Sequence, residues 1–129
     1  MKRVFLFFTL SFVTVFALAQ DDNESLDCSI IKKGTFKYLD IPDTTAYFKI
    51  KKENHTEYHR DGKYYIKSKI KWVNDCQYEM VMLSNTIPDF PFQPGAVMLV
   101  TFLKIEGDII YYSAEVDGDK WYGRLRKLE

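Results

Sequence analysis

The segment Lys63–Leu83 constrains the fold of this chain most, because its side chains alternate strictly and it turns back on itself once. A period of two residues is typical of a β-strand with one buried and one solvated face. One face of the first run carries mostly apolar residues, and the other carries Tyr65 and three lysines. Asp61-Gly62 before the segment and Asn74-Asp75 within it are sequences typical of tight turns. The segment therefore predicts an antiparallel hairpin, with which the rest of the chain is expected to pair.

The same alternation, bounded by turn residues, predicts six further strands at residues 35–39, 46–52, 55–60, 96–105, 109–116 and 121–128. Short connections favour an up-and-down meander, and closing the meander removes two exposed edges. We therefore expect an all-β fold in which about eight antiparallel strands close into a small barrel over residues 34–129. An outer-membrane barrel is excluded, because Lys67, Lys69 and Lys71 would face lipid.

Residues 1–19 have the features of a signal peptide. Lys2 and Arg3 precede an apolar run at residues 4–18, and Ala17-Leu18-Ala19 offers small residues at the cleavage positions. The run is short for a membrane span, which needs about 20 residues, so we expect cleavage after Ala19 rather than an uncleaved anchor. The protein is then expected to be exported, periplasmic or secreted, with no transmembrane segment after cleavage and a polar lead-in at residues 20–33.

Charge and cysteine content narrow the class of protein further. The chain has 18 basic and 18 acidic residues, and loss of Lys2 and Arg3 leaves a formal net charge of −2. This balance argues against a nucleic-acid partner, whose phosphates a binder must neutralise. In an exported chain the two cysteines, Cys28 and Cys76, favour a disulfide over two buried thiols. We expect no metal and no cofactor, because no histidine lies near either cysteine in the sequence.

Three segments resemble a family of small exported bacterial proteins with a lipocalin-like, or more broadly calycin-like, β-barrel: Gly34-Thr35-Phe36-Lys37-Tyr38, His55-Thr56-Glu57-Tyr58, and Ile70–Tyr78 with its Trp-x-x-x-Cys-x-Tyr pattern. The resemblance covers nearly the whole chain after the leader and implies a barrel without a catalytic motif. Some relatives carry a label linking them to DNA topoisomerase IV. About 110 residues leave no room for the ATPase module, metal-binding acidic cluster and DNA gate of such an enzyme, so we interpret that label as an error.

His55, Glu57 and His59 form the cluster closest to catalytic or metal chemistry. On a strand the two histidines lie roughly 13 Å apart, too far to share one ion. With a two-residue Asp61-Gly62 loop, Glu57 would face Ile66 and point into the barrel together with His59; a three-residue loop would turn both outward. Inside an aromatic cavity the pair would anchor a polar ligand group, and outside it would form a solvated ion pair.

The remaining candidate residues are apolar side chains with two possible roles. Tyr64, Ile66, Ile70, Trp72, Met80 and Met82 would either line a ligand cavity or fill the core. Phe90 and Phe92, in the Pro-rich segment 84–95, would either mark a mouth or cap one barrel end. A strip of five lysines would be either a solvated face or a contact for headgroups or acidic glycans: Lys49, Lys51, Lys67, Lys69 and Lys71.

These patterns lead to two hypotheses about function. The first is a non-enzymatic, monomeric, lipocalin-like protein that binds a small hydrophobic or amphipathic ligand. The alternative is a structural or interaction protein of the cell envelope, with a filled core and with contacts through the Pro-rich segment or the lysine strip. The presence and size of an interior cavity would distinguish them.

Overall fold

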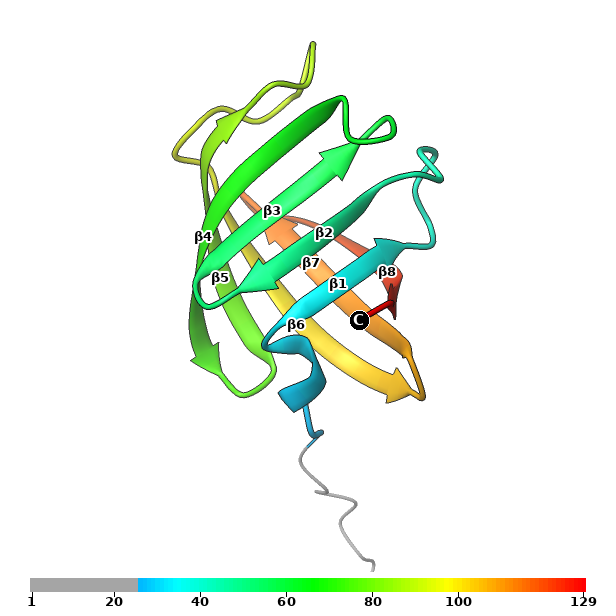
Figure 1. Cartoon of the computed structure of the whole chain (residues 1–129). Coiled ribbons are helices and arrows are strands. Elements are labelled where there is room, and N and C mark those ends of the chain that lie inside the picture. Colours follow the sequence, from blue (N-terminus) through cyan, green and yellow to red (C-terminus); the bar gives the residue numbers. More distant parts are fainter. Residues whose placement is uncertain (1–25) are drawn as a thin grey trace, which may run out of the picture.

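The computed structural model describes residues 26–129, and the predicted signal peptide lies outside these residues. Eight antiparallel strands form a closed barrel in chain order (Figure 1). They are β1 (Gly34–Tyr38), β2 (Tyr47–Lys51), β3 (Asn54–His59), β4 (Tyr64–Asn74), β5 (Gln77–Asn85), β6 (Val97–Glu106), β7 (Ile109–Val116) and β8 (Asp119–Lys127). The up-and-down meander and its closure are confirmed, and the strand ends lie within one or two residues of those predicted.

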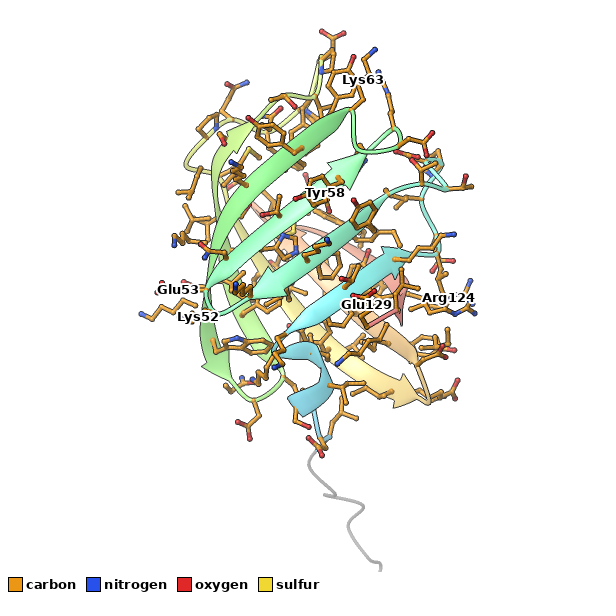
Figure 2. The ribbon with its side chains drawn as sticks, viewed as in Figure 1. Lys52, Glu53, Tyr58, Lys63, Arg124 and Glu129 are labelled. Atoms are coloured by element: carbon orange, nitrogen blue, oxygen red, sulfur yellow. A yellow bond between two sulfur atoms is a disulfide. The ribbon has the colours of Figure 1, made fainter. Side chains whose placement is uncertain are left out.

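Pairing between β1 and β8 closes the barrel. Phe36 faces Lys127 and Tyr38 faces Leu125 in that ladder. A bidentate ion pair from Arg124 to Asp40, at 2.6 and 3.0 Å, ties β8 to the β1–β2 loop on the outside (Figure 2). Every strand therefore has two neighbours, and no edge of the sheet is left unpaired.

The Asp61-Gly62 turn has the two-residue form. The Lys63 N–H donates to the Arg60 carbonyl at 3.2 Å, and Asp61 and Gly62 have φ of 57° and 80°, as a type I′ turn requires. His59 consequently faces Tyr64 and Glu57 faces Ile66. Of the two registers that the sequence allowed, the structure has the one that turns Glu57 and His59 inward.

The two ends of the barrel differ. The β2–β3, β4–β5 and β6–β7 turns lie at one end, which we call the closed end, and the four other connections lie at the opposite, loop end (Figure 1). Lys52 and Glu53 mark the first of these ends and Lys63 the second (Figure 2).

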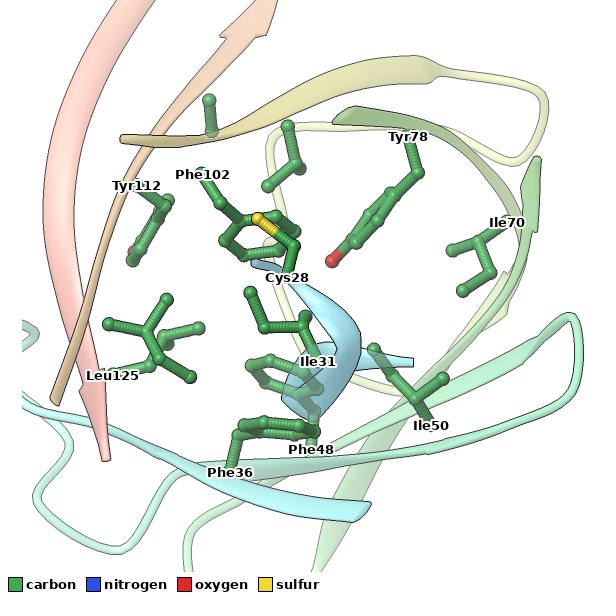
Figure 3. Packing of buried hydrophobic residues seen from close by; sticks show 13 residues of the cluster. Cys28, Ile31, Phe36, Phe48, Ile50, Ile70, Tyr78, Phe102, Tyr112 and Leu125 are labelled. Carbon is green, nitrogen blue, oxygen red and sulfur yellow. The ribbon is translucent and has the colours of Figure 1, made fainter. Parts of the chain in front are cut away.

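A short 3₁₀ helix, η1 (Ser29–Ile31), fills the closed end. Ile31 is fully buried against Phe36 and Phe48 in the core (Figure 3). Cys28 is bonded to Cys76 in the β4–β5 turn with an S–S length of 2.03 Å. The disulfide predicted from the sequence is therefore confirmed. Cys28 and η1 belong to the predicted polar lead-in, whose polarity gave no indication that Ile31 would be core.

The outer face follows the predicted alternation. Lys49 and Lys67 flank Thr56, while Lys51 and Lys69 flank Asn54, so that the lysines lie on neighbouring strands. All five lysines of the strip are exposed. Among residues 26–129, no helix is long and apolar enough to cross a membrane.

Candidate functional site

The loop end of the barrel contains a cavity of about 260 Å³. Its mouth includes Val97 and Trp121, which are 49% and 37% exposed, and its inner part is walled by buried side chains. All eight strands, the β1–β2 loop and the Pro-rich segment contribute to its lining, which consists of Tyr38, Ile41, Phe48, His55, Glu57, His59, Ile66, Ser68, Tyr78, Met80, Met82, Phe90, Phe92, Ala96, Val97, Met98, Val100, Tyr112, Ala114, Val116, Trp121 and Leu125. The volume is slightly below the ~300 Å³ at which typical small-molecule pockets begin.

Glu57 is the carboxylate of this cavity, and both of its oxygens are engaged. The Tyr38 hydroxyl donates to Oε1 in a short hydrogen bond, and the His59 Nε2–H donates to Oε2 at 3.0 Å. On its other side, His59 Nδ1 lies 3.6 Å from Asp43 Oδ2. Asp43 in turn accepts from the Thr45 hydroxyl and from the Arg60 backbone N–H. This chain of contacts joins β1, β3 and the β1–β2 loop on one side of the mouth.

The network fixes the charges of its members. Burial raises the pKa of Glu57, but the hydrogen bond from His59 and the nearby imidazoles outweigh burial, so the pKa lies below its usual value. The hydrogen bond to Glu57 raises the pKa of His59 against the opposing effect of burial. Burial, followed by the Glu57 charge, raises the pKa of Tyr38 well above its usual value, so the hydroxyl remains a donor. The network is therefore a carboxylate that accepts from a tyrosine hydroxyl and from an imidazole ring whose protonated form the carboxylate favours.

His55 and Ser68 lie deeper, face each other across β3 and β4, and are 2% and 3% exposed. The His55 ring stacks on Phe48 at 4.5 Å, and burial lowers the pKa of His55 to about 4, so the ring is neutral at pH 7. Neither His55 Nδ1 nor Ser68 Oγ has a hydrogen-bond partner. An unpaired buried polar group lowers the stability of a fold by about 1–3 kcal/mol. Two such groups on neighbouring strands of the cavity wall therefore call for an explanation.

Tyr112 lines the opposite wall and depends on the residue beside it. Gly123 faces Tyr112 across β7 and β8, and a Cβ at Gly123 would lie 2.6 Å from the Tyr112 hydroxyl oxygen. The absence of a side chain there lets the phenol ring lie against the backbone of β8. This cross-strand arrangement of an aromatic ring over a glycine is a known way to pack a glycine within a sheet.

Seven of the ten candidate residues from the sequence line the cavity: Glu57, His59, Ile66, Met80, Met82, Phe90 and Phe92. The two phenylalanines contact each other edge to face at 5.7 Å and are half-buried, so they cover part of the loop end.

Three candidate residues do not line the cavity: Tyr64, Ile70 and Trp72. For these three the predicted cavity-lining role is wrong. Ile70 and Trp72 lie on the inner face but at the closed end, where Trp72 packs edge to face on Tyr78 at 5.1 Å. The Lys32 ammonium covers the Trp72 ring at 3.2 Å from its centroid. Tyr64 lies beyond the cavity at the loop end, between the cationic groups of Arg60 and Lys63. A period of two identifies the inward face but not the depth along the barrel.

The sequence pattern placed His55 in a cluster with Glu57 and His59 but not among the cavity residues. It missed several other lining residues, of which Tyr38, Ser68, Tyr78, Tyr112 and Trp121 carry polar atoms. His55 and Ser68 could have been found, because they share the inward faces of Glu57 and Ile66. Tyr38 reaches Glu57 across the intervening strand β2, and Trp121 lies on β8, which neighbours β1 only through closure of the barrel.

Comparison of the chain with family models, with curated proteins and with solved structures gives no match. Within residues 26–129, no three His, Cys, Asp or Glu side chains are grouped so that they could hold a metal ion.

Proposed function

We propose that this protein is an exported, non-enzymatic barrel that binds a small hydrophobic or amphipathic ligand in the cavity at its loop end. The observation that carries the proposal is the cavity itself, about 260 Å³ of mostly apolar space in a small domain. If such a space stayed empty and dry, it would cost at most about 6 kcal/mol at ~24 cal/mol per Å³. That is comparable with the whole stability of a typical domain, so a bound ligand is the simplest reason for retaining it.

The disulfide and the leader support export. A bond between Cys28 and Cys76 persists in oxidising compartments and is rare in reducing ones. The leader-like sequence of residues 1–19 points to the same address, periplasmic or secreted.

Binding rather than catalysis is favoured by the state of Glu57. Both carboxylate oxygens accept hydrogen bonds, from Tyr38 and from His59, and these bonds help to hold the pKa of Glu57 below its usual value, which makes Glu57 a weak general base. The same two hydrogen bonds hold the Glu57 side chain in one orientation in the cavity wall.

Native mass spectrometry of protein purified from its own host tests the proposal. We expect a co-purifying molecule that is lost in Ala114→Phe, because Ala114 is buried in the cavity wall and a phenyl ring there would occupy the space. Glu115→Phe is the matched control, since Glu115 faces outward from the next position of β7. Absence of a co-purifying molecule, together with no thermal shift from a panel of alcohols, acids and ring compounds, would contradict the proposal.

The alternative is an interaction protein of the cell envelope. It is favoured by the filled closed end and by the exposed lysines of β2 and β4. If no ligand is found, and replacing Lys49, Lys67 and Lys69 by glutamine releases the protein from isolated envelopes, the alternative would take its place.

A further inference from the structure

The cavity wall presents no unpaired charge. Among residues 26–129, the side chains that line the cavity include no lysine or arginine, and Glu57 is the one carboxylate among them. Glu57 is already matched by His59 at 3.0 Å, and His59 also lies 3.6 Å from Asp43. A ligand carboxylate would therefore enter without a cationic partner and would meet the Glu57 charge. A ligand ammonium would have to displace His59 from Glu57.

The wall does present two polar atoms without partners, His55 Nδ1 and Ser68 Oγ. A serine hydroxyl both donates and accepts, and a neutral imidazole nitrogen does one or the other according to its tautomer. A hydroxyl group has the same two capacities and carries no charge, so its hydrogen-bonding capacity matches that of these two unpaired atoms, which belong to residues facing each other across β3 and β4.

We propose that the ligand is an uncharged aliphatic alcohol whose hydroxyl group is held by His55 and Ser68 while its apolar chain extends toward Phe90 and Phe92. This inference rests on the proposed function and adds the chemical class of the ligand. Burying a neutral hydroxyl with two partners is far less costly than burying a carboxylate or an ammonium that has none. The apolar side chains between these two ends, among them Ile66 and Met82, accept the hydrocarbon.

The volume sets the size of the test compound. If each non-hydrogen atom occupies about as much space as a water molecule in the liquid, ~30 Å³, then a cavity of about 260 Å³ holds about nine of them. 1-Octanol has that size, and octanoate and octylamine are its charged counterparts.

Titration of the isotope-labelled protein with these three compounds at pH 7.5 tests the proposal. The two tryptophan indole N–H signals report position, because Trp121 lines the cavity and Trp72 is packed at the closed end. We expect 1-octanol to shift the Trp121 signal and leave the Trp72 signal in place, with octanoate and octylamine binding at least about tenfold more weakly. Octanoate or octylamine binding as tightly as 1-octanol would overturn the alcohol assignment while leaving the proposed function intact. If none of the three shifted Trp121, the alcohol assignment would fail, while the proposed function would still be decided by the co-purification and thermal-shift tests.

A second measurement locates the hydroxyl group. Ser68→Ala should weaken 1-octanol binding about fivefold and leave the binding of ethylbenzene, which has no polar group, unchanged. Ser84→Ala is the matched control, because Ser84 pairs with Lys67 on the outer face. Equal binding of 1-octanol by Ser68→Ala and by the parent protein would show that the hydroxyl is not held there. Equal weakening of both ligands would show a general change in the cavity, and would overturn the assignment as well.

Discussion

At the scale of single residues, Glu57 and His59 each hold the other in its charged form. The pKa of Glu57 is lowered, so its contribution to stability is present above its unfolded pKa and is lost as the pH falls through the lowered value. The pKa of His59 is raised, so its contribution is complete below about pH 6.5 and is lost as the pH rises through the raised value. The pair therefore stabilises the fold most in mildly acidic solution.

The chain has two histidines, so proton NMR can follow each ring separately. We expect one ring, His59, to titrate above pH 6.5 and the other, His55, to titrate near pH 4. In Glu57→Gln the pKa of His59 should fall, because the hydrogen-bonded carboxylate that raises it most is gone and only Asp43 still opposes the effect of burial. Glu53→Gln, in the exposed β2–β3 turn, should leave both titrations unchanged. A His59 titration unaffected by Glu57→Gln would contradict the observed pairing.

His55 acts in the opposite direction on acid stability. Its ring is buried and neutral with a pKa of about 4, whereas in the unfolded chain it would titrate near 6.5. Unfolding therefore takes up a proton below pH 6.5, and by pH 4 this costs about 3 kcal/mol of stability. His55→Phe keeps a ring stacked on Phe48 and removes the titration. Urea unfolding at pH 7 and pH 4 should show that the variant loses about 3 kcal/mol less than the parent protein; equal losses would contradict this account.

Whether the Glu57 side chain points into or out of the barrel could be only partly predicted from the sequence. Alternation established that Glu57 and His59 share a face, but the choice of face depended on whether the Asp61-Gly62 loop has two or three residues. Both loops are compatible with the same sequence, and a shift of one residue reverses every side chain. The structure selects the shorter loop, with Lys63 bonded to Arg60.

At the scale of elements, η1 and the disulfide act together. Cys28 and Cys76 are 48 residues apart in the chain, and a cross-link of that length stabilises a fold by about 4 kcal/mol in the chain-entropy model. It also holds Ile31 in the closed end.

The double variant Cys28→Ser/Cys76→Ser should therefore lose about 4 kcal/mol in urea unfolding, and Trp72 fluorescence should change, because Lys32 and η1 are no longer held over its ring. Intact mass after thiol alkylation gives the control: the oxidised parent protein should take up no label. Unchanged stability in the double variant would show that η1 is held in the closed end by packing alone.

The strands could be predicted from the sequence and η1 could not, for a physical reason. Each strand repeats a two-residue pattern over several residues and is bounded by turn sequences such as Asp61-Gly62 and Asp117-Gly118, so its signal accumulates. A three-residue 3₁₀ helix has no period to detect. Ile30 and Ile31 stand alone among polar residues, and only the contacts of the folded barrel reveal that Ile31 belongs to the core.

At the scale of the whole molecule, the barrel is packed along part of its axis and hollow along the rest. The sequence left cavity and filled core as alternatives for one set of inward residues, because alternation gives no measure of depth. The structure divides that set: Ile70 and Trp72 fill the closed end, while Ile66, Met80 and Met82 line the cavity.

This division predicts a gradient of hydrogen exchange. Amides bonded at the closed end, such as Phe102 N–H to the Cys76 carbonyl at 2.8 Å, should exchange most slowly. Amides of the Pro-rich segment, such as Gly95 N–H to the Met82 carbonyl, should exchange faster and should become protected when a ligand occupies the cavity. Measurement by NMR or mass spectrometry checks both statements, and uniform protection along the barrel would contradict the first.

Because η1 fills the closed end, a ligand can enter and leave the cavity only through the loop end. Within residues 26–129, η1 and the aromatic side chains around it fill the barrel opposite the mouth, so the cavity is a pouch rather than a passage. Ligand exchange in a cavity with one mouth is sequential, because the bound ligand must dissociate before a second ligand can enter. A competitor would therefore not speed the release of a bound molecule, and the dissociation rate would depend on the contacts within the cavity and on passage through its one mouth.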